Sequence, residues 1–460
     1  MCRRLLMLTF IALVAIASVG FASPIKPNVV LIMVDDLGYY DLGCYGHPEI
    51  KTPVLDGLAK GGMRLTSFYA GATVCTPSRM ALMTGSYPSR VGWEIGVMGY
   101  KMGTHDGMSP EAVTIAEIFK SEGYATAISG KWHIGDQPTT RPNAQGFDSA
   151  YYSSHSNNQT RKTWRGDEVV EKKNVNCMLT EQFTTEAIRF IKEKKDNPFF
   201  LYLAYTAPHF PVQPHPDWKG KSSFGKYGDV VEEVDYRIGE VVKTLKELHL
   251  YENTIIVFIS DNGPNPYKTS GCLPYRGSKW SSLEGGTRVP GIVSWPGVVP
   301  AGQESDTLVA AIDLLPTLCS ACGIDWKKKT TKNLVVDGID SWDLMLGKKG
   351  EHGRKELLYW HGMGEFHAIR KGDWKLFFDR QSAVTGTGTL RKTPEQAAKI
   401  KKFAAGNAPI LFNVTDDPGE TVDLSEKYPD KVKELKALAD KRIAEIKGGR
   451  ILPIQKYEKP

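Results

Sequence analysis

The segment Val29-Val30-Leu31-Ile32-Met33-Val34 is apolar at every position, and Asp35-Asp36 follow it directly. A continuous apolar run, as opposed to an alternating one, is typical of a parallel strand that is covered on both faces. Three further runs have the same character, namely Ala125–Ser129, Phe199–Tyr205 and Thr254–Ile259. These runs predict the central strands of a mostly parallel sheet.

Helix-like segments lie between the predicted strands. They are Thr114–Glu122, Leu179–Lys194 and Val230–Leu248, and the last carries apolar residues near helical spacing at Val231, Val234, Ile238, Val241, Val242 and Leu245. Strands that alternate with amphipathic helices indicate a doubly wound α/β sheet. Three short strand-like runs between residues 357 and 378, followed by a polar helix over Lys431–Lys447, predict a separate antiparallel sheet with a helix packed on it.

Polar side chains follow each of the four apolar runs. They are Asp35 and Asp36, then Lys131 and His133, then His209, and finally Asp261 and Asn262. Because open α/β sheets bind ligands beyond the carboxyl ends of their strands, we expect these side chains to meet at one edge. The carboxylate and amide oxygens among them suit a hard cation, Ca²⁺ or Mg²⁺, better than Zn²⁺.

Length and composition exclude some classes of protein and suggest how the chain divides into domains. The 460 residues exceed one typical core, and 41% hydrophobic with 24% charged residues excludes a mostly disordered chain. The net charge of +6 is mild, so nucleic-acid binding is not indicated. We expect three segments: a secretory signal over residues 1–22, a catalytic α/β domain over 23–350, and a C-terminal domain over 351–460. The signal predicts a secreted or periplasmic protein with no stable membrane insertion.

The stretch Val74-Cys75-Thr76-Pro77-Ser78-Arg79, which continues to Met83-Thr84-Gly85, carries the most specific signal. Pro77 and Ser78 suit the start of a helix, which would run over Ser78–Thr84 and place Cys75 at its N-terminus. Backbone N–H groups at a helix N-terminus favour an anion, and Arg79 lies one turn further on. The C-x3-R spacing differs from the C-x5-R loop of tyrosine phosphatases, and a reactive thiol is ill suited to an oxidising compartment.

This stretch resembles the signature of the formylglycine sulfatases, the type I sulfatases of the alkaline phosphatase superfamily. The resemblance extends to Asp35-Asp36-Leu37-Gly38, Gly130-Lys131-Trp132-His133, Ser260-Asp261-Asn262-Gly263, the segment from Gly277 to Pro290 that includes Lys279, and Arg370–Leu376. It covers nearly the whole mature chain and is greatest for the arylsulfatase and galactosamine-6-sulfatase group. It implies an alkaline phosphatase-like fold, with a large mixed, mostly parallel sheet flanked by helices and a smaller C-terminal α+β domain.

The resemblance also implies a cofactor set and residue roles. Cys75 would be oxidised to Cα-formylglycine by a separate maturation enzyme, and the hydrated aldehyde would supply the nucleophilic oxygen. Ca²⁺ would be held by Asp35, Asp36, Asp261, Asn262 and the modified Cys75. Arg79 and Lys131 would hold the nucleophile and neutralise sulfate. His209 and Lys279 would stabilise the leaving oxygen, and His133 would act as the base.

The implied substrate is a sulfated saccharide, and the sugar itself is left open. The candidate substrate contacts are Ser154, His155, His105 and His361. Two alternatives remain. One is a formylglycine-dependent phosphate or phosphonate ester hydrolase of the same superfamily. The other is a non-catalytic protein that binds sulfated glycans, although such a protein would be expected to lose Cys75 or the metal-binding loops.

Overall fold

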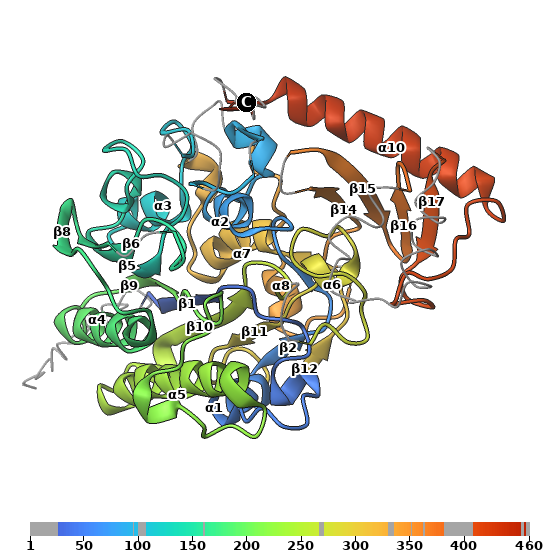
Figure 1. Cartoon of the computed structure of the whole chain (residues 1–460). Coiled ribbons are helices and arrows are strands. Elements are labelled where there is room, and N and C mark those ends of the chain that lie inside the picture. Colours follow the sequence, from blue (N-terminus) through green and yellow to red (C-terminus); the bar gives the residue numbers. More distant parts are fainter. Residues whose placement is uncertain are drawn as a thin grey trace, which may run out of the picture.

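The computed structural model describes residues 26–94, 96–99, 107–159, 162–265, 271–329, 335–350, 352–361, 364–380, 408–451 and 455–456. The predicted signal peptide and His105 lie outside these residues. Figure 1 shows a large sheet with helices on both faces and a second, smaller sheet beside it. The predicted fold class is therefore confirmed.

The large sheet has ten strands in the order β12-β2-β11-β10-β1-β9-β5-β6-β7-β8. The four predicted strands are its centre: β1 (Asn28–Val34), β5 (Ala125–Lys131), β9 (Phe199–Ala204) and β10 (Thr254–Ser260). They pair in parallel, with β1 between β9 and β10. β6 (Ser149–Ser153) continues the parallel part, whereas β11 (Gly291–Ser294) pairs with β10 in the antiparallel sense. The mixed outer part includes β2 (Met63–Leu65), β7 (Thr163–Arg165), β8 (Glu168–Glu171) and β12 (Gln303–Ser305).

Helices cover both faces of this sheet and enclose two apolar cores (Figure 1). One face carries α1 (Pro53–Lys60), α4 (Leu179–Glu193) and α5 (Gly225–Glu247). The other carries α2 (Cys75–Thr84), α3 (Ile115–Ser121), α7 (Leu314–Ala321) and α8 (Trp342–Met345). Burial on both faces explains why the central strands are apolar throughout. Among the described residues, no helix is both long and apolar enough to cross a bilayer.

The smaller sheet is antiparallel, in the order β14 (Glu356–Trp360), β15 (Phe366–Lys371), β16 (Trp374–Phe377) and β17 (Ile410–Asn413). The long helix α10 (Pro429–Gly448) packs on it through Leu435, Ala439 and Ile446 (Figure 1). β17 was not predicted as a strand. The apolar core beneath this sheet also includes Tyr69 and Leu283 of the larger unit, so the two parts share one packed interface.

Candidate active site

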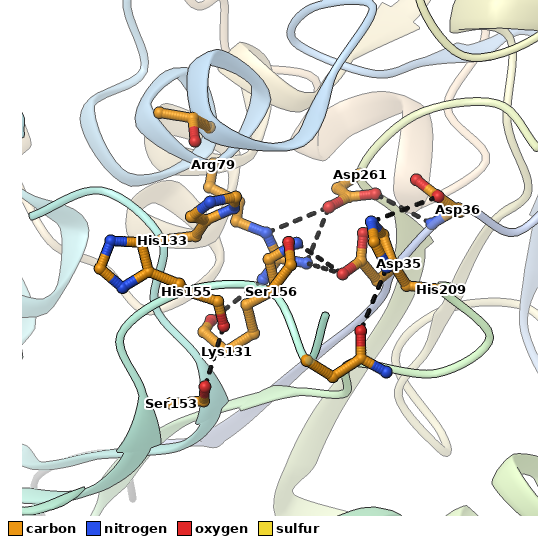
Figure 2. A network of polar contacts seen from close by, with 12 residues as sticks. Asp35, Asp36, Arg79, Lys131, His133, Ser153, His155, Ser156, His209 and Asp261 are labelled. Carbon is orange, nitrogen blue, oxygen red and sulfur yellow. Dashed lines mark hydrogen bonds and ion pairs between the residues drawn. The ribbon is translucent and has the colours of Figure 1, made fainter. Parts of the chain in front are cut away.

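The carboxyl ends of β1, β5 and β10 meet the N-terminus of α2, and together they form one buried polar cluster (Figure 2). Asp35 and Asp36 follow β1, Lys131 ends β5, and Asp261 and Asn262 follow β10. Each of these five residues is at most 1% exposed. The parallel register of β1 with its two neighbours brings residues that are far apart in sequence to one edge of the sheet.

Arg79 reaches this edge from α2. Its Nε and Nη2 lie 3.0 and 2.7 Å from Oδ2 of Asp261, and its Nη1 donates to the carbonyl oxygen of Lys131 at 3.0 Å. The helix begins at Cys75, three residues earlier than predicted. Pro77 fits inside its first turn because the N–H that proline lacks has no partner within the helix at that position. Cys75 is therefore the first helical residue, and it is 1% exposed.

Two lysines pair with the carboxylates of β1. Lys131 Nζ lies 2.5 Å from Asp35 Oδ2, and Lys279 Nζ lies 2.6 Å from Asp36 Oδ1. Burial disfavours the charge of Asp35, but Lys131 first, then His209 and Arg79, outweigh burial and hold its pKa far below the usual range. Burial likewise opposes the charge of Lys279, whereas Asp36 raises its pKa. The cluster thus holds charged groups of both signs away from water.

Three oxygen atoms in the cluster are buried without a hydrogen-bond partner among the described residues. They are Oδ1 of Asp35, Oδ2 of Asp36 and Oδ1 of Asn262. A buried oxygen without a partner is costly, so such atoms call for an explanation such as a bound ion. In addition, ligand atoms of Asp35, Cys75 and Asp261 lie within 4.8 Å of one another, and so do those of Asp35, Asp36 and His209. The residues present therefore fit a hard cation.

His133 follows Lys131 and projects toward the same cluster (Figure 2). Its Nε2 lies 3.0 Å from the carbonyl oxygen of Met98, which can only accept, so Nε2 carries the hydrogen. Its Nδ1 is buried with no hydrogen-bond partner in the described part of the chain, and it therefore keeps a lone pair. Burial first, and then the charge of Lys131, lowers the pKa of His133 well below its ordinary value. The imidazole is thus neutral at pH 7 and can accept a proton at Nδ1.

His209 lies on the opposite side of the cluster, at the end of β9. Its Nε2 is 3.7 Å from Asp36 Oδ2, and its Nδ1 contacts Oδ1 of Asn157 at 3.1 Å and the carbonyl oxygen of Phe210 at 2.6 Å. Both of these partners are hydrogen-bond acceptors, so Nδ1 carries the hydrogen. Nε2 faces the carboxylate of Asp36, a predicted metal ligand. Burial and then Lys279 lower the pKa of His209.

The four candidate substrate contacts have different positions. Ser154 and His155 follow β6, and Ser154 Oγ lies 2.9 Å from His155 Nδ1. The His155 ring is 6.0 Å from that of His133, centroid to centroid, so both residues belong to the edge of the site. His361 lies in the loop between β14 and β15, 5.8 Å from the Trp280 ring. His105 falls outside the described residues.

Sequence reasoning missed several groups that complete the cluster. The Tyr202 hydroxyl lies 3.3 Å from Arg79 Nη1, Asn157 orients His209, and the Met98 carbonyl fixes the tautomer of His133. Tyr202 and Met98 carry no local signal, since one is a strand residue and the other acts through its backbone. Asn157 lies in a polar stretch after β6, which was the one available hint.

Two family profiles match the chain in succession. The profile described as Sulfatase matches residues 27–324, and that described as C-terminal region of aryl-sulfatase matches residues 352–451. This chain belongs to the sulfatase family. The protein is thus an arylsulfatase-like hydrolase that acts on sulfate esters, and the first match spans the strands and loops that bear the buried cluster.

Individual relatives agree with this assignment. Human arylsulfatase A is 33% identical over 90% of this sulfatase and 86% of its own length. The dog N-acetylgalactosamine-6-sulfatase is 33% identical over 89% of this chain and 84% of its own length. The crystal structure of PsFucS1 sulfatase from Pseudoalteromonas sp. superposes with a TM-score of 0.81 at 29% identity, covering 94% of this chain and 92% of that one.

Proposed function

We propose that this sulfatase removes sulfate from a sulfated saccharide, with Cys75 converted to formylglycine and with Ca²⁺ in the active site. The observation that carries the proposal is the meeting of Cys75, three partnerless buried oxygens and three cations at one edge of the sheet. Each of these features has a use in sulfate-ester hydrolysis.

The charges of the cluster balance, so a bound divalent cation would make the site positive. Asp35, Asp36 and Asp261 contribute three negative charges, and Arg79, Lys131 and Lys279 contribute three positive ones. Bound Ca²⁺, held by the three carboxylates, Asn262 and the modified Cys75, would supply the positive charge that holds and polarises a sulfate oxygen. The loaded site would therefore favour an anionic ester.

Burial of Cys75 supports its modification. Burial raises the pKa of the Cys75 thiol, although Lys131 and Lys279 act in the opposite direction. A buried thiol with a raised pKa is a poor nucleophile, because only the thiolate attacks. Formylglycine in its hydrated form would supply an oxygen nucleophile at the same position. A separate maturation enzyme is a required partner in this proposal.

The roles of the surrounding side chains follow from their atoms. Arg79 and Lys131 neutralise the sulfate and keep it aligned with residue 75, at no cost in reorganisation because both are already held in place. The lone pair on Nδ1 makes His133 the base that takes the proton from the nucleophile residue. Lys279, which is charged, and His209 lie on the Asp36 side of the cluster, where they can stabilise the leaving oxygen.

The saccharide part of the proposal has two supports. A relative that is 33% identical along most of its length is named as an N-acetylgalactosamine-6-sulfatase. Ser154 and His155, which suit sugar hydroxyls, border the cluster, and His361 lies beside Trp280, which packs on the Cys75 segment. A secreted or periplasmic location, proposed from the N-terminal signal, fits an enzyme whose substrate is a large polymer.

The test is desulfation of a panel of sulfated mono- and oligosaccharides by enzyme that is co-expressed with a formylglycine-generating system. We expect release of sulfate, and loss of that release in Cys75→Ala. Intact mass of the peptide that contains residue 75 should show the loss of sulfur and gain of oxygen that formylglycine requires. Activity that survives Cys75→Ala, or that occurs only on phosphate or phosphonate esters, would refute the proposal.

A further inference from the structure

Trp280 follows the active-site Lys279 and has an unusual backbone. Its φ is 75°, in the left-handed region that bulky side chains rarely adopt. The conformation is held by its own N–H, which donates to the carbonyl oxygen of Thr73 at 2.9 Å. Glycine would adopt this φ without strain, so the tryptophan side chain is retained against a backbone penalty. Such a residue beside an active site calls for a functional explanation.

The Trp280 side chain lies against the nucleophile position. It packs on a small cluster that consists of Val74, Cys75 and Val97, and it is itself only half-buried. The ring therefore packs on the cluster that contains the residue that would attack sulfur, and part of it is open to solvent. In the proposed function Lys279 stabilises the leaving oxygen, so Trp280, the next residue in the chain, borders the space proposed for the leaving sugar.

The C-terminal sheet extends this aromatic surface. The His361 ring lies 5.8 Å from that of Trp280, and it stacks on His367 at 5.0 Å with 18° between the ring planes. His367 is 6% exposed, and its Nδ1 lies 3.1 Å from Ser282 Oγ of the catalytic unit. His367 thus holds the plane of the His361 ring by stacking on it. A hydrogen bond of 2.9 Å between His361 Nδ1 and Glu365 Oε2 fixes the orientation of the ring within that plane.

His361, Glu365 and His367 could also be considered as metal ligands, because their donor atoms lie within 4.8 Å of one another. The ring stacking argues against this use. Imidazole lone pairs lie in the plane of the ring, so two nearly parallel rings direct them along parallel planes and not toward a common point. The Glu365 side chain is also 66% exposed and already paired with His361. Stacking, and not coordination, is the arrangement that the geometry favours.

We propose that Trp280, extended by His361 and supported by His367, forms an aromatic platform that binds one face of the sugar ring from which sulfate is removed. The proposal rests on the saccharide substrate proposed above and adds the residues that select it. A pyranose ring presents a face of C–H groups that packs on an aromatic ring, while its hydroxyl groups stay available for hydrogen bonds at the rim. Two units of the chain thus build one substrate site.

Trp280→Gly tests the platform, because glycine removes the side chain and relaxes the backbone at once. We expect KM for the best sulfated saccharide to rise about tenfold, which corresponds to about 1.4 kcal/mol, with a smaller change in kcat. Inhibition by the desulfated product should weaken by the same factor, whereas inhibition by inorganic sulfate should stay unchanged. Trp280→Phe should keep most of the affinity, and the midpoint of thermal unfolding of Trp280→Gly should not fall.

Trp326→Ala is the matched control, since Trp326 is another half-buried tryptophan and lies in a separate short helical turn, Trp326–Lys328. It should leave KM and product inhibition unchanged. If the wild type desulfates saccharides but Trp280→Gly keeps its KM and product inhibition, the platform is refuted and the proposed function stands. If sulfate inhibition weakens equally, Trp280 acts on the sulfate site, which also refutes the platform. A wild type that desulfates no saccharide overturns both proposals.

Discussion

Lys375→Met should strongly destabilise the junction between the two units. Lys375 lies on β16 with no exposed surface, and its Nζ is 2.9 Å from Oε1 of Glu284 and 3.0 Å from Oε1 of Glu420. Glu284 follows the segment that carries Lys279 and Trp280, whereas Glu420 follows β17. Lys375 thus joins the active-site segment to the C-terminal sheet through buried charges. Methionine keeps most of the aliphatic stem and removes the charged Nζ, which also lies 4.3 Å from the centre of the Tyr359 ring.

The loss of stability in Lys375→Met depends on which partners Glu284 and Glu420 keep after Lys375 is replaced. Glu284 keeps Arg288 at 3.4 Å and Arg370 at 3.6 Å, so its charge stays compensated. Glu420 keeps the N–H of Glu284, which donates to its Oε2 at 2.7 Å, and the weaker attraction of Arg276, but it loses the ion pair with Lys375. Breaking a buried pair by removing one partner costs about 3–5 kcal/mol. Because Glu420 can take up a proton, we expect the lower end, about 3 kcal/mol. The unfolding entropy of a chain of 460 residues is about 1 kcal/mol/K, so Tm should fall by about 3 °C.

Thermal and urea unfolding at pH 7.5 measure this effect, and a second substitution tests its cause. In Lys375→Met/Glu420→Gln the unpaired charge is gone and the amide oxygen can still accept from the Glu284 N–H. The double variant should therefore recover most of the lost stability. Lys348→Met, which removes a surface partner of Asp343, should leave Tm unchanged. A Tm of Lys375→Met within about 1 °C of the wild type, or a double variant no more stable than the single one, would refute the reasoning.

Three further predictions concern the site and the same junction. Chelation of divalent cations should abolish sulfatase activity, and added Ca²⁺ should restore it. In Asp36→Asn, the Ca²⁺ concentration that gives half of the full activity should rise about tenfold or more, as measured by calcium titration of the chelated enzyme. His133→Gln should lower kcat by about 10²–10⁴-fold with little change in KM in steady-state assays, because it removes a base and no charge; equal changes in both constants would contradict this role. Burial, together with the nearby Glu284 carboxylate, raises the pKa of Glu420 above its ordinary value. Its contribution therefore favours the folded state at acid pH and is lost as pH rises through the raised pKa. The Tm of Glu420→Gln relative to wild type should thus be higher at pH 8.5 than at pH 5.

The central strands and the polar residues that follow them could be predicted because local sequence determines both. Continuous apolar runs identify β1, β5, β9 and β10, and parallel pairing places their carboxyl ends at one edge regardless of strand order. The order itself, with β1 between β9 and β10, was not predictable, because similar apolar strands can pair in several ways. The edge strand β8 also gave no signal, since Glu168–Glu171 is exposed or half-exposed along its length.

The groups missed by sequence analysis act through long-range contacts. Met98 contributes a backbone carbonyl, which every residue has. This carbonyl matters only because folding places its oxygen 3.0 Å from His133 Nε2. Glu284 and Lys375 are 91 residues apart, and each is an ordinary charged residue until the two units pack together. The helix α2 began three residues before its predicted start, because Pro77 marks the first turn of a helix and not its first residue.

Backbone conformation shows where local preference and function diverge. Among the described residues other than glycine, five have positive φ, and three of them lie in or beside the candidate active site: Asp36 at 66°, His133 at 61° and Trp280 at 75°. Aspartate and histidine tolerate this region better than most residues other than glycine, whereas a bulky tryptophan costs about 1–3 kcal/mol of strain there. Each is held by its own N–H, which donates to Asp261 Oδ1, to the Ser154 carbonyl or to the Thr73 carbonyl, respectively. These positions hold a proposed metal ligand, Asp36, the proposed base, His133, and the proposed sugar platform, Trp280. The unusual backbone therefore occurs where the direction of the side chain matters most. The same reasoning predicts that Trp280→Gly gains stability as it loses substrate affinity, a trade that would not occur if the tryptophan served the fold alone.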